Sequence, residues 1–121
     1  MREILFRGKR LDNGEWIEGF VYQISDDTAM FIMLKNKHAE SYQVDFATVG
    51  QYTGLVDKNG KRIFEGDILC LTMPRPLEVK FTDGWFHMEG TAVPIKHAGK
   101  FRIIGNIHDN PKLLKEGEDD G

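Results

Sequence analysis

Cysteine is almost absent from this sequence, and that scarcity excludes several ways of holding a small protein together. The 121 residues contain a single cysteine, Cys70, so no intramolecular disulfide can form. Zinc deaminases need a cysteine pair, so the short sequence His-Met-Glu at 87–89 does not indicate their chemistry. A chain of this length buries roughly two-thirds of the surface that it exposes when unfolded, so it needs no disulfide or metal ion for stability. We expect Cys70, between two leucines, to be a buried and unreactive thiol.

Long apolar runs are also missing. No window approaches the roughly 18 apolar residues of a membrane-spanning helix. The N-terminal sequence MREILFRGKRL carries charges too frequently for a signal peptide. With 40% hydrophobic and 29% charged residues, the composition is that of an ordinary globular protein. The sequence therefore predicts a cytoplasmic protein that does not enter a membrane.

A net excess of negative charge is found only at the C-terminal end of the sequence. Residues 115–121 hold one lysine and four acidic residues, which accounts for the whole formal charge of −3. The remaining residues are balanced, and we expect this acidic tail to be solvated. A balanced body argues against strong nonspecific binding to DNA, which depends on neutralising phosphates. It leaves room for a small local basic site.

Side chains arranged for catalysis are missing as well. The two serines, Ser25 and Ser41, do not lie in a nucleophile elbow. The four histidines show no metal-ligand spacing, and no glycine-rich phosphate loop occurs. The sequence therefore predicts a protein that is not an enzyme and has no metal and no cofactor.

Glycines and short apolar runs are abundant, and they predict strands and turns. Thirteen glycines separate runs rich in β-branched and aromatic residues. Asn13-Gly14 and Asp83-Gly84 are turn signals, because these residues tolerate positive φ. The one predicted helix spans 109–117, with Asn110 as N-cap and Pro111 in the first turn.

These patterns predict a mainly β fold. We expect a small SH3-like β-barrel in the C-terminal part, packed with an N-terminal β-hairpin or meander region, and a short C-terminal helix. The predicted division is 1–48 and 49–121, or one compact unit that includes both. In the strand predicted at 77–81, strict alternation points Leu77, Val79 and Phe81 inward.

Two predicted strands carry most of the aromatic and apolar surface of the N-terminal half. In residues 15–24, the period of two places Trp16, Phe20, Tyr22 and Ile24 on one face, interrupted by Glu18. Met30–Leu34 is unbroken apolar sequence, which predicts cover on both faces of its strand. That cover could come from the same chain or from a second copy, so a homo-oligomer is one alternative.

Basic and aromatic residues form a candidate nucleic-acid site. Small β-barrels can stack bases on exposed aromatic rings beside basic side chains. The alternative is that both tryptophans belong to the core and the charges form a solvated rim. The candidates are Arg7, Lys9, Arg10, Lys35, Lys37, Trp16 and Trp85.

The densest stretch, YTGLVDKNGKRIFEGDIL at 52–69, is best explained as architecture. A calcium loop with Gly60 at its sixth position would place Leu55 at its first and Gly66 at its last, where carboxylates are required. Glu65 and Asp67 could share a strand face as an acid pair. The glycine between them favours a turn in which Asp67 binds backbone amides.

Three segments follow one another along the chain: MREILFRGKRL, VGQYTGLVDKNGKRIFEGDIL (49–69) and IIGNIHDNPKLL (103–114). In sequence and order they resemble the YopX family of small phage and prophage proteins. The resemblance implies an SH3-type barrel in the C-terminal part, phage or prophage origin and no established activity, so the partner is an unknown host or phage macromolecule. The matching positions, with an expected structural role, are Tyr52, Thr53, Gly54, Leu55, Asp57, Gly60, Glu65, Gly66 and Asp67.

Overall fold

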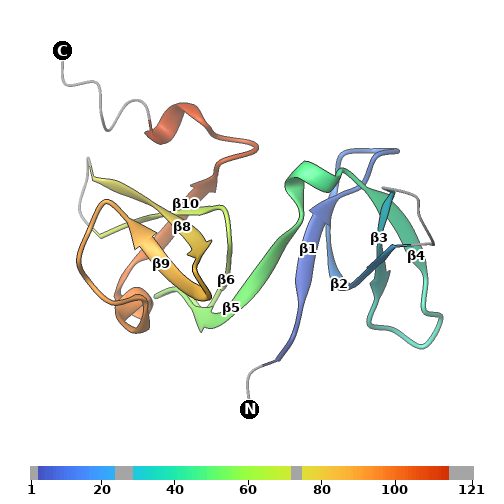
Figure 1. Cartoon of the computed structure of the whole chain (residues 1–121), viewed down its shortest axis with the longest axis horizontal. Coiled ribbons are helices and arrows are strands. Elements are labelled where there is room, and N and C mark those ends of the chain that lie inside the picture. Colours follow the sequence, from blue (N-terminus) through green and yellow to red (C-terminus); the bar gives the residue numbers. More distant parts are fainter. Residues whose placement is uncertain (1–2, 24–28, 72–74, 115–121) are drawn as a thin grey trace. The chain divides into compact units, whose positions relative to one another are not determined.

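The chain is mainly β. The computed structural model describes residues 3–23, 29–71 and 75–114, and these form two antiparallel sheets (Figure 1). The chain divides into two compact units, Met1–Tyr52 and Thr53–Gly121. The elements are β1 (Phe6–Lys9), β2 (Trp16–Gln23), β3 (Met30–Leu34), β4 (Ser41–Val44), η1 (Phe46–Thr48), β5 (Gly50–Val56), β6 (Arg62–Phe64), β7 (Asp67–Cys70), β8 (Pro76–Thr82), β9 (Trp85–Glu89), η2 (Ile95–Lys100) and β10 (Arg102–Asn106), where η marks a 3-10 helix.

The first unit is a meander in which β4, β3, β2 and β1 lie side by side in that order and β5 follows β1. The predicted turn between β1 and β2 is present, with Gly14 at a φ of 73°. The side-chain oxygen of Asn13 accepts the backbone N–H of Glu15 at 2.9 Å. The N–H of Gly14 donates to the carbonyl of Arg10 at 2.9 Å and closes the loop.

One face of this first sheet is buried and carries the core of the unit. Ile32 and Val44 are buried on it. Gly8 and Gly19 lie on the same face, and a Cβ atom on either would come within 3.2 Å of the Ile32 side chain. The chain therefore covers one face of the apolar run Met30–Leu34, whereas Phe31 and Met33 are half-buried on the other face.

The second unit holds a four-stranded sheet with the order β10-β7-β8-β9. The predicted turn Asp83-Gly84 joins β8 to β9, with φ values of 54° and 86° that suit a two-residue hairpin. Cys70 is buried, as predicted. The core of this unit consists of Ile63, Leu69, Val79, Met88, Ala98 and Phe101.

Two local predictions in the second unit need correction. Phe81 is not buried in the core: it is 45% exposed, and the centroid of its ring lies 4.7 Å from that of Phe86. Residues 95–100, where no helix was predicted, form the 3-10 helix η2. Near the C-terminus, only Lys112–Leu114 of the predicted helix are helical. Residues 109–111 are turn or irregular, and 115–117 lie outside the described residues. The side chain of Asn110 accepts the N–H of Asn106 at 3.2 Å.

Strand β5 belongs to both units. Gly50 and Gln51 of β5 pair with β1. The two units divide after Tyr52. The other neighbour of β5 in the sheet is β6. The division predicted from the sequence, after residue 48, falls between η1 and the start of this strand. In the part of the chain that the structure describes, no helix has both the length and the apolar character needed to cross a membrane.

Candidate functional site

Asp57 is the centre of the stretch 52–69, and its carboxylate binds the backbone. Its Oδ1 accepts the N–H groups of Asn59 and Lys61, both at 2.9 Å. Its Oδ2 accepts the N–H of Ile103 at 3.0 Å, 46 residues further along the chain. Burial raises the pKa of the Asp57 carboxyl, but these N–H donors outweigh burial and lower its pKa below the usual value. The side chain thus connects a turn to strand β10.

The other residues of this stretch also make structural contacts. The Thr53 hydroxyl donates to the carbonyl of Ile63 at 2.8 Å. Asp67 is only 2% exposed, and its Oδ2 accepts the N–H of Phe64 at 2.8 Å. Gly54, Gly60 and Gly66 have φ values of 89°, 83° and 94°, a region that favours glycine. Asp67, one half of the candidate acid pair, therefore forms a hydrogen bond with the backbone. Glu65, the other half, lies half-buried in the preceding turn.

The predicted nucleic-acid residues do not form one cluster. Arg10 is no longer a candidate for binding nucleic acid. Its guanidinium binds Asp12 at 2.9 and 2.6 Å and lies 3.8 Å from the centroid of the Tyr42 ring. Lys37 is exposed in the turn after β3, and Trp85, 74% exposed, belongs to the second unit. The structure brings together Arg7, Lys9, Trp16 and Lys35 on the first unit.

These four residues share the outer face of the first sheet with further aromatic rings. Directly paired residues of antiparallel strands present their side chains on the same face. Lys9 pairs with Trp16, Phe20 with Met33, and Tyr22 with Phe31. We call this surface the aromatic face. Its residues are Arg7, Lys9, Trp16, Glu18, Phe20, Tyr22, Phe31, Met33 and Lys35.

Contacts within the aromatic face place cations over aromatic rings. The Arg7 Cζ lies 4.6 Å and the Lys9 Nζ 5.8 Å from the centroid of the Trp16 ring. The Lys35 Nζ lies 5.5 Å from the centroid of Phe20. Tyr22 and Phe31 stack with their centroids 5.4 Å apart.

Phe20, Tyr22 and Phe31 were not among the predicted binding residues. The period of two already places Phe20 and Tyr22 on the face of Trp16, so the signal for these two rings was present in the sequence. Phe31 joins them through the pairing of β2 with β3, which no local pattern encodes. Phe20 is 44% and Tyr22 36% exposed, so both rings are accessible.

Comparison with known proteins decides the family. A model of the YopX protein family matches residues 5–115. The chain belongs to the YopX family. This YopX protein also resembles a solved structure, the crystal structure of protein EF1440 from Enterococcus faecalis, with a TM-score of 0.62 and 28% sequence identity over 94% of this chain and 99% of that one. No curated protein matches it.

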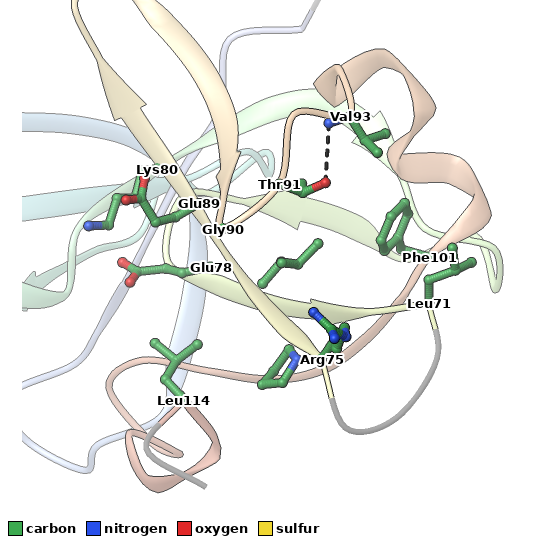
Figure 2. Close-up of a pocket in the computed structure, with 12 residues that line it drawn as sticks. Leu71, Arg75, Glu78, Lys80, Glu89, Gly90, Thr91, Val93, Phe101 and Leu114 are labelled. Carbon is green, nitrogen blue, oxygen red and sulfur yellow. Dashed lines mark hydrogen bonds between the residues drawn. The ribbon is translucent and has the colours of Figure 1, made fainter. Parts of the chain in front are cut away.

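The second unit of this YopX protein contains a cleft of about 640 Å³ beside β8 and β9 (Figure 2). Apolar side chains on its walls include Leu77 and Phe101. Charges of both signs line it, with Arg75 and Lys80 opposed by Glu78 and Glu89. Across the described residues, no group of three or more His, Cys, Asp or Glu could hold a metal ion. The cleft therefore shows no preference for an anionic or a cationic ligand, and the aromatic face is the stronger candidate.

Proposed function

We propose that this YopX protein is a non-enzymatic module of phage or prophage origin that acts in the bacterial cytoplasm and binds another macromolecule through its aromatic face. The observation that supports this most is the exposure of Phe20 and Tyr22 on a face that also holds Trp16 and Phe31. Contiguous exposed aromatic surface is uncommon on proteins that act alone, and aromatic residues dominate the energetics of interfaces.

The stretch 52–69 and the second unit have a structural role in this proposal. Asp57, Thr53 and Asp67 bind backbone groups, as hydrogen-bond partners of turns and strands do. The SH3-like barrel predicted for the C-terminal part belongs to the same proposal. Its support is a set of short strands, the tight turn at Asp83-Gly84 and the Gly-Asp step that opens β7.

The apolar run Met30–Leu34 contributes to the same face. Ile32 is fully buried, whereas Phe31 and Met33 point to the outer side and are half-buried there. Self-association through this run would therefore use the aromatic face and compete with any other partner. One experiment can examine both alternatives.

Site-specific photocrosslinking tests the proposal. The photoreactive residue benzoylphenylalanine replaces Phe20 or Tyr22 in the full chain, and Trp85 in a control chain. Trp85 is more exposed than either but lies in the second unit. In bacterial cells that produce the protein, we expect adducts with a specific macromolecule from positions 20 and 22 that are absent from position 85. A second substitution, Trp16→Ser, should abolish them.

Three results would overturn the proposal. The first is the same set of adducts from all three positions, and the second is no adduct from any of them. The third is a dimer of this chain as the sole adduct, which would assign the aromatic face to self-association.

A further inference from the structure

We infer that the ligand of the aromatic face is single-stranded nucleic acid. This inference rests on the proposed function, because it names the class of macromolecule that the same surface binds. It depends on the spacing of the rings, the position of the cations and the charge of the whole chain.

The spacing of the rings suits unpaired bases. Phe20 and Tyr22 are two residues apart on β2, so their side chains lie roughly 6.8 Å apart along the strand. Stacked bases in a duplex strand are separated by only about 3.4 Å. Successive bases can therefore stack on these rings only if the strand is extended and its bases are parted. Every base has a π face, so such stacking tolerates any sequence.

The cations lie where the phosphates of such a strand would pass. Arg7 and Lys9 lie over the Trp16 ring at one end of β2, and Lys35 lies over the Phe20 ring nearer the other end. Lys35 also pairs with Glu3, but both side chains are about 40% exposed. An exposed ion pair contributes little, so a phosphate can replace Glu3 at small cost.

The arrangement favours nucleic acid over a protein partner. The cores of protein–protein interfaces are depleted of lysine, because burial against a protein removes water from its charge. Here Lys9 and Lys35 lie next to the rings rather than at a distant rim. A ligand with alternating flat π surfaces and anionic groups matches that alternation of rings and cations. A duplex does not, since its bases are paired and stacked.

The acidic charge of the chain sets the kind of binding to expect. At a formal charge of −3, the protein has no general attraction for phosphates. Stacking must therefore supply most of the affinity, at about 1–3 kcal/mol for each base. The face holds three cations and the carboxylate of Glu18, which is paired across the strands with Arg7. The slope of log K on log salt is therefore at most about −2 in size, which is shallow for a nucleic-acid-binding protein.

Fluorescence anisotropy with labelled oligonucleotides tests the inference. The probes are oligothymidylate and oligouridylate of about twelve nucleotides, within the usual range of site sizes, and a duplex of the same length. Trp16→Leu, Phe20→Leu and Tyr22→Leu keep apolar bulk but remove the π surface. We expect each to weaken binding of the single strands about 5- to 150-fold, with Trp85→Leu unchanged as the matched control.

A second series measures the contribution of charge. Lys9→Gln should make the salt slope shallower by about 0.7, whereas Lys96→Gln, an exposed lysine of the second unit, should not change it. Circular dichroism verifies the fold of each variant. If Trp16→Leu unfolds, the more exposed Phe20 and Tyr22 still carry the test.

The outcomes separate this inference from the proposed function. Equal binding of duplex and single strand, or an equal effect of Trp85→Leu, overturns the inference. No saturable binding of single strands, together with protein adducts from positions 20 and 22, overturns the inference and supports the binding module. No binding and no adducts overturn both.

Discussion

Asp57 holds three segments of the second unit through one carboxylate. Its two oxygens accept N–H groups from Asn59, Lys61 and Ile103, which belong to the turn after β5, its return arm and strand β10. Hydrogen bonds to a charged group contribute more than neutral ones, roughly 1.5–3 kcal/mol each. A single side chain thus stabilises a local turn and a long-range contact together.

We expect Asp57→Asn to lower the free energy of unfolding by about 2 kcal/mol at neutral pH, because the amide cannot accept at both positions. The lowered pKa adds a dependence on pH. A carboxyl with a folded pKa below its unfolded value near 3.8 stabilises the fold above that pH, and this stabilisation is lost as pH falls through the folded pKa. Urea unfolding at pH 7 and below pH 4 should show the difference between wild type and variant shrinking in acid.

The matched control is Asp83→Asn. Asp83 is exposed in the β8–β9 turn with a φ of 54°, a conformation that asparagine adopts readily. It should change stability by less than about 0.5 kcal/mol at either pH. If Asp57→Asn proves as stable as wild type at pH 7, the carboxylate does not have the role described above.

At the level of strands and turns, the sequence predicted those features that depend only on neighbouring residues. Asn13-Gly14 and Asp83-Gly84 mark their turns because a positive φ is a property of the residues themselves. The aromatic face of β2 followed from the period of two. Its extension to Phe31 did not, because it depends on how β2 and β3 align. Helix η2 was missed because no side chain caps its N-terminus, so no capping signal is visible.

The alignment of β2 with β3 depends on Gly19. A Cβ atom at this position would lie 2.1 Å from the carbonyl oxygen of Met33, and a backbone atom cannot move aside as a flexible side chain can. We expect Gly19→Ala to destabilise the protein by about 1–3 kcal/mol through this clash. A thermal melt measures the change.

Gly99→Ala is the control for that change. Its added Cβ would meet only the Val56 carbonyl oxygen at 3.7 Å, an ordinary contact, so we expect a shift within about 0.5 kcal/mol. Equal melting temperatures for Gly19→Ala and Gly99→Ala would show that β2 and β3 tolerate a wider separation than the structure has.

For the whole chain, strand β5 runs from the first unit into the second, and we expect this continuity of the chain to couple their unfolding. The backbone N–H of Tyr52 donates to Leu5 of the first unit at 2.8 Å, and the next residue, Thr53, binds Ile63 of the second. When either unit unfolds, the half of β5 that lies in that unit loses its hydrogen-bond partner. We therefore expect the slowest-exchanging amides of both units to report one global opening.

Hydrogen–deuterium exchange of Gly19→Ala tests this coupling, because the substitution lies in the first unit alone. The free energy of opening should fall by a similar amount, about 1–3 kcal/mol, for buried amides of β2 and for those of Leu69 and Val79 in the second core. In Gly99→Ala both sets should keep their protection. Loss confined to the first unit would contradict the coupling, and would mean that β5 can fray at Tyr52 while the second unit stays folded.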